Sequence, residues 1–157
     1  MNFKNIPTSW WGIFILSFLS LQSLRALEVK VLEPCSDKVI YQKKWTKSFD
    51  NVGIATIKTF DKLKVPYVGN DLGIHSIHGT PVGDDALEII SRMEMRSYGW
   101  CYKVDEELPE VLPINFPLET EHKTITWYFG FARYLRGEWI SQCEPVSKIK
   151  PQFICRH

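Results

Sequence analysis

The four cysteines of this chain constrain its fold more than any other feature. They are widely spaced, at Cys35, Cys101, Cys143 and Cys155. A structural zinc site needs ligand pairs two to four residues apart, and no two of these cysteines stand that close. An even number of cysteines in an oxidising compartment favours two disulfides over free thiols. Four cysteines permit three pairings, which sequence alone does not distinguish.

The N-terminal segment indicates that the chain enters such a compartment. Lys4 precedes an uncharged run of twelve residues, Trp10 to Leu21, which has the length of the apolar part of a signal peptide. A run of this length is too short to cross a hydrocarbon core of ~30 Å, which takes about 20 residues. Ala26 offers a small residue for cleavage, with Ser23 as the other candidate.

We therefore expect residues 1–26 to be a cleavable signal peptide. The alternative is an uncleaved N-terminal membrane anchor. With cleavage, residues 27–157 form the exported protein, in a periplasm or in the medium, without a stable membrane span. A length of about 131 residues is typical of one domain, and an aromatic content of 13% is too high for a disordered chain.

The charge balance excludes one class of partner. The chain has 19 basic and 18 acidic side chains, and two of the basic ones, Lys4 and Arg25, lie in the expected signal. The exported part is therefore close to neutral. A neutral domain lacks the basic surface that nucleic acids or anionic lipids require, so we expect no nucleic-acid partner.

Apolar periodicity predicts an α+β domain with two helices. Helical spacing runs from Val52 to Leu63, after a possible cap at Asp50 or Asn51, and again from Ala86 to Met93, after Asp84 and Asp85. Alternation or β-branched and aromatic content predicts strands at 27–32, 97–104, 124–134 and 138–143. Between them, residues 67–83 are rich in glycine, and residues 105–123 are rich in acids and prolines, so both segments are predicted to be loops.

The strand at 124–134 carries the clearest aromatic pattern. Alternation places Trp127, Phe129 and Phe131 on one face, where three large rings are typical of a core. The other face has Tyr128 with the small residues Gly130 and Ala132, a shape that could receive a flat ligand ring. The ligand-binding candidates are Tyr128, Tyr102, Tyr67 and Trp139, although sheets also carry such residues purely for packing.

The sequence contains no recognisable catalytic set. There is no Gly-x-Ser-x-Gly elbow, no His-Glu-x-x-His pair and no phosphate-binding glycine loop. His75 and His78 lie near Asp71, but in an extended chain two residues three apart point to opposite faces. We therefore expect no catalytic residue, no metal site and no cofactor.

Element positions favour one pairing of the cysteines. Cys101 lies on a predicted strand and Cys143 at the end of the last predicted hairpin, whereas Cys35 and Cys155 lie near the two ends of the exported chain. We therefore favour Cys101–Cys143 with Cys35–Cys155, and the other two pairings remain open.

Residues 98–105 read Tyr-Gly-Trp-Cys-Tyr-Lys-Val-Asp. This segment resembles the Gly-Trp-x-Tyr-x-Val-Asn-Gly signature of the transcobalamin-like C-terminal domain family, which is common in exported bacterial proteins. The resemblance spans about residues 50–132, with the helix at 52–63 similar to an early helix of that family. Glu106 departs from it, because the family has glycine there, and the helical barrel of the animal cobalamin carriers is absent.

The resemblance implies a β-grasp-like fold, with a small mixed or antiparallel sheet, that covers a flat ring such as a corrin from one side. We therefore expect an exported, non-catalytic binding module for a ring ligand, corrinoid-like, or for an extracytoplasmic protein partner. The alternative is a secreted enzyme or enzyme inhibitor that acts through the loops at 67–83 and 105–123.

The signal-peptide prediction has a direct test. N-terminal sequencing of exported material should find a first residue close to Leu27, because the arrangement of Lys4, the apolar run and Ala26 matches a cleavable signal. Exported protein that begins at Met1 would contradict the prediction and favour the membrane anchor.

Overall fold

The computed structural model describes residues 26–155, so most of the expected signal peptide lies outside the described residues. The described chain contains one α-helix, α1 (Val52–Leu63), and three short 3-10 turns. It contains eight strands: β1 (Leu27–Leu32), β2 (Val39–Trp45), β3 (Tyr67–Asn70), β4 (Gly73–Ile77), β5 (Leu87–Ser91), β6 (Glu94–Val104), β7 (Thr124–Leu135) and β8 (Glu138–Pro145).

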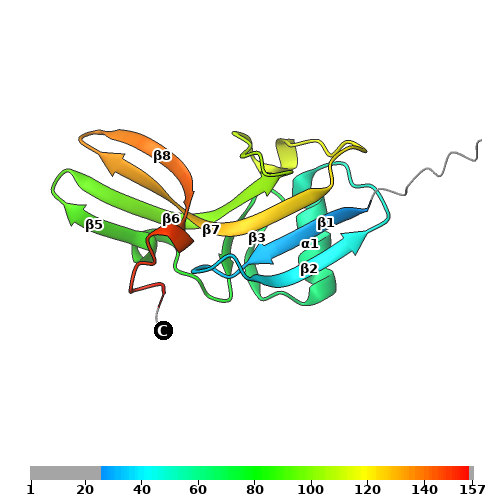
Figure 1. Cartoon of the computed structure of the whole chain (residues 1–157), viewed down its shortest axis with the longest axis horizontal. Coiled ribbons are helices and arrows are strands. Elements are labelled where there is room, and N and C mark those ends of the chain that lie inside the picture. Colours follow the sequence, from blue (N-terminus) through cyan, green and yellow to red (C-terminus); the bar gives the residue numbers. More distant parts are fainter. Residues whose placement is uncertain (1–25, 156–157) are drawn as a thin grey trace, which may run out of the picture.

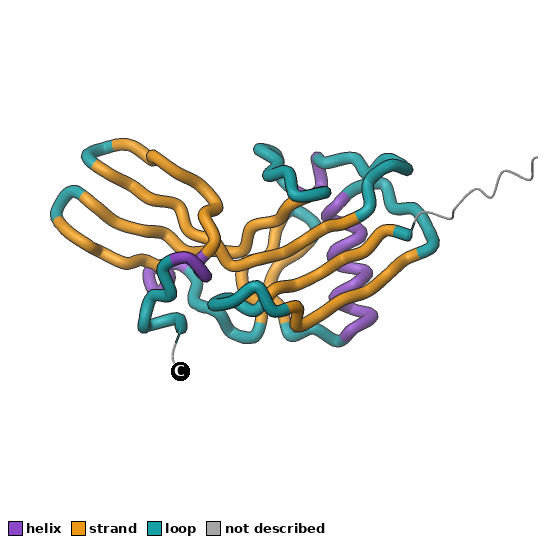
Figure 2. The backbone as a smooth tube through the Cα atoms, viewed as in Figure 1, coloured by secondary structure: helices purple, strands orange, loops and turns teal. Residues whose placement is uncertain are grey.

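The main sheet is organised around β7. Its order is β2-β1-β7-β6-β5, with β1 parallel to β7 and the other neighbours antiparallel. All of β6 pairs with β7, over residues 125–135 of β7. On the other side, β7 pairs with β1 over residues 124–127 and with β8 over residues 130–135. The sheet therefore has two halves, one backed by α1 and one made of hairpins that extends beyond the helix (Figures 1 and 2).

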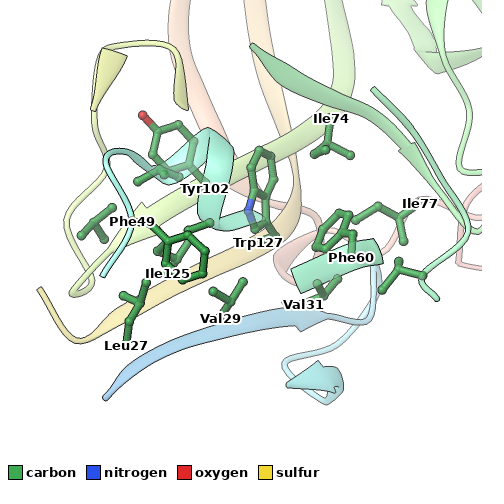
Figure 3. Close-up of a cluster of buried hydrophobic side chains, with 14 residues drawn as sticks. Leu27, Val29, Val31, Phe49, Phe60, Ile74, Ile77, Tyr102, Ile125 and Trp127 are labelled. Carbon is green, nitrogen blue, oxygen red and sulfur yellow. The ribbon is translucent and has the colours of Figure 1, made fainter. Parts of the chain in front are cut away.

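The half backed by α1 holds the larger core. Val29, Val31, Phe60 and Ile125 are fully buried there together with Trp127 (Figure 3). The Trp127 indole N–H donates to Thr56 Oγ1 of α1 at 2.9 Å, so the largest core ring also satisfies its polar atom.

Local signals explain the bounds of α1. The Asn51 side chain accepts a hydrogen bond from the Ile54 N–H, which caps the first turn. Lys64 ends the helix in a left-handed conformation with φ 56°, two residues before Pro66. The helix that we predicted at 52–63 is confirmed.

The second core lies under the hairpin half. Tyr98, Phe129 and Phe131 pack there with Val146 and Cys155, which belong to the C-terminal tail. The predicted inward face of β7 is therefore confirmed, since Trp127, Phe129 and Phe131 are all less than 5% exposed.

Two disulfides close the fold. Cys35 bonds to Cys155 and Cys101 to Cys143, which is the pairing that we favoured. The second bond joins β6 to β8 across the intervening β7, with a Cα–Cα distance of 5.8 Å. Strands two apart in a flat sheet are separated by about 9.5 Å. The end of β8 therefore folds over β7 at Gly130, which has no side chain to obstruct it.

The predicted two-helix, β-grasp-like α+β arrangement is wrong. Residues 26–155 hold one α-helix and two sheets, and form a small, β-rich α+β domain. Where a second helix was expected, Gly83–Ala86 forms a 3-10 turn and Leu87–Ser91 forms β5. The glycine-rich segment at 67–83, which we predicted to be a loop, contains the β3–β4 hairpin.

Cross-strand contacts explain why β5 is not helical. Leu87, Ile89, Ile90 and Met93 are exposed, so a helical stripe of these residues has no core to cover. Glu88 instead pairs with Arg96 of β6 at 3.0 Å and accepts a hydrogen bond from the Tyr98 hydroxyl. These contacts between β5 and β6 favour the hairpin over the helix.

The crossing at Gly130 predicts a difference between two glycines that face each other across β6 and β7. A Cβ at Gly130 would lie 3.0 Å from Cys101 Sγ and 3.2 Å from the Glu144 carbonyl oxygen, whereas a Cβ at Gly99 would meet nothing within 4 Å. We expect Gly130→Ala to lower the free energy of unfolding by about 1–3 kcal/mol. Gly99→Ala is the control, and thermal melting is the measurement. Equal melting temperatures for the two variants would contradict the crossing.

Candidate binding cleft

The main cleft opens beside β6, along the part of its outer edge with which no described strand pairs. Strand β5 covers the outer edge of β6 only from Glu94 to Ser97. Beyond that point a cleft of about 1000 Å³ lies along residues 100–102. One wall is the turn between β3 and β4, a second is the loop at 108–113, and the end of β8 adds Gln142 and Cys143.

Aromatic rings form the floor of this cleft. Trp100, Tyr102 and Trp127 all line it. The Trp100 indole N–H donates to Thr80 Oγ1 at 2.8 Å, and its ring packs against Phe129 at 5.4 Å. The Tyr102 hydroxyl donates to the Val111 carbonyl oxygen at 2.7 Å. Because these polar atoms already have partners within the protein, the floor presents apolar ring surface.

The same two hydrogen bonds hold the walls in place. Thr80 follows β4, so the bond from Trp100 ties the β3–β4 side of the cleft to its floor. Val111 belongs to the opposite loop, so the bond from Tyr102 ties that loop to the same floor. Both loops are therefore fixed to the floor of the cleft.

The rim is unusually apolar for a surface. Four large side chains that line the cleft are 42–53% exposed: Leu72, Leu108, Val111 and Leu112. Polar groups are few and dispersed, namely Asn70, His75, Glu110 and Gln142. A concave site with mostly apolar lining and a few polar groups is typical of ligand-binding sites.

The titratable groups that the fold perturbs are structural. Burial raises the pKa of Tyr102 to about 12, and also raises that of Tyr128 to about 12. Both phenols therefore stay protonated at neutral pH and act as hydrogen-bond donors. Within residues 26–155, no three His, Cys, Asp or Glu side chains come close enough to hold a metal ion.

Of the four predicted ligand-binding residues, only Tyr102 lies in this cleft. Tyr128 is on the opposite face of the sheet, 5% exposed, with its hydroxyl donating to the Cys143 carbonyl oxygen at 2.8 Å. It lines a second, smaller hollow of about 310 Å³, where Lys103 Nζ lies 5.3 Å from its ring centroid. The glycine-rich segment at 67–83 does not line that hollow.

The other two candidates lie elsewhere. Tyr67 packs against Phe60 and donates to Asp61 Oδ1 at 3.2 Å. Trp139, near the tip of the β7–β8 hairpin, is 49% exposed and packs against Tyr134. The four residues therefore do not form one site.

Sequence reasoning named the loop at 105–123 only for the enzyme or inhibitor alternative, and did not identify its apolar residues at 108–112 as part of a ligand-binding site. Leu108, Val111 and Leu112 stand among prolines and acids, and this composition predicts a solvated loop. The sequence signal that could have identified this loop is the occurrence of three large apolar residues in a segment that otherwise consists of acids and prolines. Such residues need a partner surface, and here they face β6 across the cleft.

No helix within residues 26–155 is both long and apolar enough to cross a membrane. Comparisons of the chain with protein-family models, with curated proteins and with solved structures found no match. The resemblance of residues 98–105 to the transcobalamin-like family therefore stays a prediction.

The raised phenol pKa values predict a loss of stability in alkali. Below pH 10 the tyrosines are protonated in both the folded and the unfolded chain. Between pH 10 and about 12 the unfolded chain releases these protons while folded Tyr102 and Tyr128 retain theirs, so unfolding becomes easier. We expect Tyr102→Phe combined with Tyr128→Phe to flatten this fall, measured by urea unfolding from pH 8 to pH 12. Parallel pH profiles for the variant and the parent protein would contradict the prediction.

Proposed function

We propose that this protein is an exported, non-catalytic binding module that holds an apolar ligand in the cleft beside β6. The observation that carries the proposal is the aromatic floor of Trp100 and Tyr102, whose side-chain polar atoms are already hydrogen-bonded, inside a rim of exposed aliphatic side chains. Apolar surface that water still contacts is the main source of binding energy available to a ligand.

Two features support export. The described chain holds two disulfides and no free cysteine, and disulfides persist in oxidising compartments. The N-terminal pattern of Lys4, the uncharged run and Ala26 is that of a secretory signal. The periplasm or the medium is therefore the proposed location.

The ligand is either a flat ring or part of a protein partner. A corrinoid is the ring that the family resemblance implies, and the floor of Trp100 and Tyr102 offers ring surface for it. A partner segment is favoured by the width of the apolar rim, which reaches from Leu72 to Leu112. The cleft is open, so a small ring would keep part of its surface in water and bind modestly.

The alternative is that the protein is an enzyme or an enzyme inhibitor, and one observation supports this alternative. The two loops that this alternative requires, within 67–83 and 105–123, do form the two walls of the cleft. Among the residues that line it, however, His75 and Glu110 are the only ones with an imidazole or a carboxyl group. They stand on different walls, without a nucleophile beside either.

The proposal predicts the effect of a charge at the rim. Leu112→Lys places an ammonium group where an apolar ligand must lie, so we expect binding to weaken at least about tenfold. Two uncharged probes, Nile red and cyanocobalamin, are titrated into each protein, and the readouts are the fluorescence of Nile red and the quenching of tryptophan fluorescence. Val82→Lys is the matched control, because Val82 is 49% exposed, like Leu112 at 53%, and does not line the cleft.

Equal affinity of Leu112→Lys and Val82→Lys for a probe that binds the parent protein would place the binding site elsewhere. Turnover of a peptide, ester or glycan by the purified protein would establish the enzyme alternative instead.

A further inference from the structure

The backbone of β6 points polar groups into the cleft. The Val104 N–H donates to the Glu107 carbonyl oxygen, and the Glu107 N–H donates back to the Val104 carbonyl oxygen, both at 3.0 Å. The backbone groups of Val104 therefore point away from β7. The next residue points the other way, because the Asp105 N–H donates to the Thr124 carbonyl oxygen at 2.9 Å.

This alternation extends along β6. In an antiparallel strand, successive residues direct their N–H and C=O groups to opposite sides. The pairing of β6 with β7 runs without a bulge from Glu94 to Val104, so the alternation is not interrupted. Tyr102 and Trp100 are two and four residues before Val104, respectively, and their backbone groups therefore also point away from β7, toward the cleft.

These groups have no partner within residues 26–155. Strand β5 stops pairing at Ser97, and no backbone or side-chain hydrogen bond reaches the N–H or C=O of Trp100 or Tyr102. Two donors and two acceptors thus lie in register along the cleft. Backbone groups in an apolar surround favour a hydrogen-bond partner, because an unpaired group that is removed from water is costly.

The other strand edges of the sheet are protected from pairing, and this one is not. The outer strand β2 carries Lys43 and Lys44, and charged side chains discourage an added strand. Strand β5 is interrupted by a bulge between Ile89 and Ser91, and β8 is shifted twice against β7. Along residues 100–102, β6 is regular and is bordered by apolar walls.

We propose that the ligand of the cleft is an extended peptide segment of a partner protein, which adds to β6 as a further strand beside Trp100 and Tyr102. This inference rests on the proposed binding function and names its ligand class. A segment of about four to six residues can supply alternating donors and acceptors at the spacing of β6. Its side chains then alternate between the two sides of the added strand, and apolar residues suit the side that faces the aromatic floor. A flat aromatic ring offers no such row of polar groups.

The free protein provides the first test, which needs no ligand. Amide hydrogen exchange measured by NMR should be faster at Trp100 and Tyr102 than at Cys101 and Lys103, whose N–H groups face β7. Protection of all four amides to the same degree would show that the outer edge of β6 is already paired, and would overturn the proposal.

The second test identifies how a peptide is bound. Peptides are selected from a random dodecapeptide phage library against the exported protein, and the selected peptide is resynthesised with one N-methyl group at each position in turn. We expect losses of about tenfold at every second position, where the peptide N–H faces β6, and little change between them. Binding should also protect the amides of Trp100 and Tyr102.

The outcomes separate this inference from the proposed function. Uniform effects of N-methylation would mean that side chains alone hold the peptide, and would overturn strand addition. Binding of Nile red or cyanocobalamin without any selectable peptide would leave the proposed function standing and reject the peptide. If neither probes nor peptides bind, both proposals fail.

Discussion

The covalent bond between Cys101 and Cys143 organises the centre of the molecule. It holds β6 and β8 at a Cα–Cα distance of 5.8 Å although β7 separates them in the sheet. The crossing requires a residue without a side chain at Gly130 and places the Cys143 carbonyl oxygen where the Tyr128 hydroxyl donates to it. The cleft depends on this arrangement as well, because the folded-over end of β8 contributes Gln142 and Cys143 to its lining. In a flat sheet, β8 would lie beyond β7 and away from the edge of β6.

The sequence predicts those parts of the fold that local signals determine. Asn51 and Pro66 mark the ends of α1, and alternation along β7 identifies Trp127 as a core residue. Both signals lie within a few residues of the structure that they produce. The segment from Leu87 to Met93 was not predictable in this way, because its apolar residues suit a helix as well as a strand. What distinguishes the strand is its pairing with β6, where Glu88 forms an ion pair with Arg96, a residue that lies beyond the segment itself.

The cleft was less predictable than the fold for a related reason. Tyr102 could be named from its aromatic character, but its role depends on where β5 stops along β6, which no local pattern reveals. Tyr128 has the same chemistry and an equally suggestive position between small neighbours. It lies on the other face of the sheet, where the end of β8 covers it. Adjacent residues of a strand point to opposite faces of the sheet. The chemical type of an aromatic residue alone therefore does not tell which face, and so which site, it belongs to.

The bond between Cys35 and Cys155 has a mechanical consequence. It closes a loop with a sequence separation of 120 residues that contains α1 and every strand from β2 to β8, so that β1 is the one strand of residues 26–155 outside the loop. If the chain were pulled from its two ends, as when an exported protein is anchored at one end and holds a partner at the other, the tension would pass through the sulfur bridge. The strands inside the loop would carry no load. The force would fall on β1, which pairs with β2 on one side and β7 on the other, so that its rows of hydrogen bonds would have to shear together before the domain could extend.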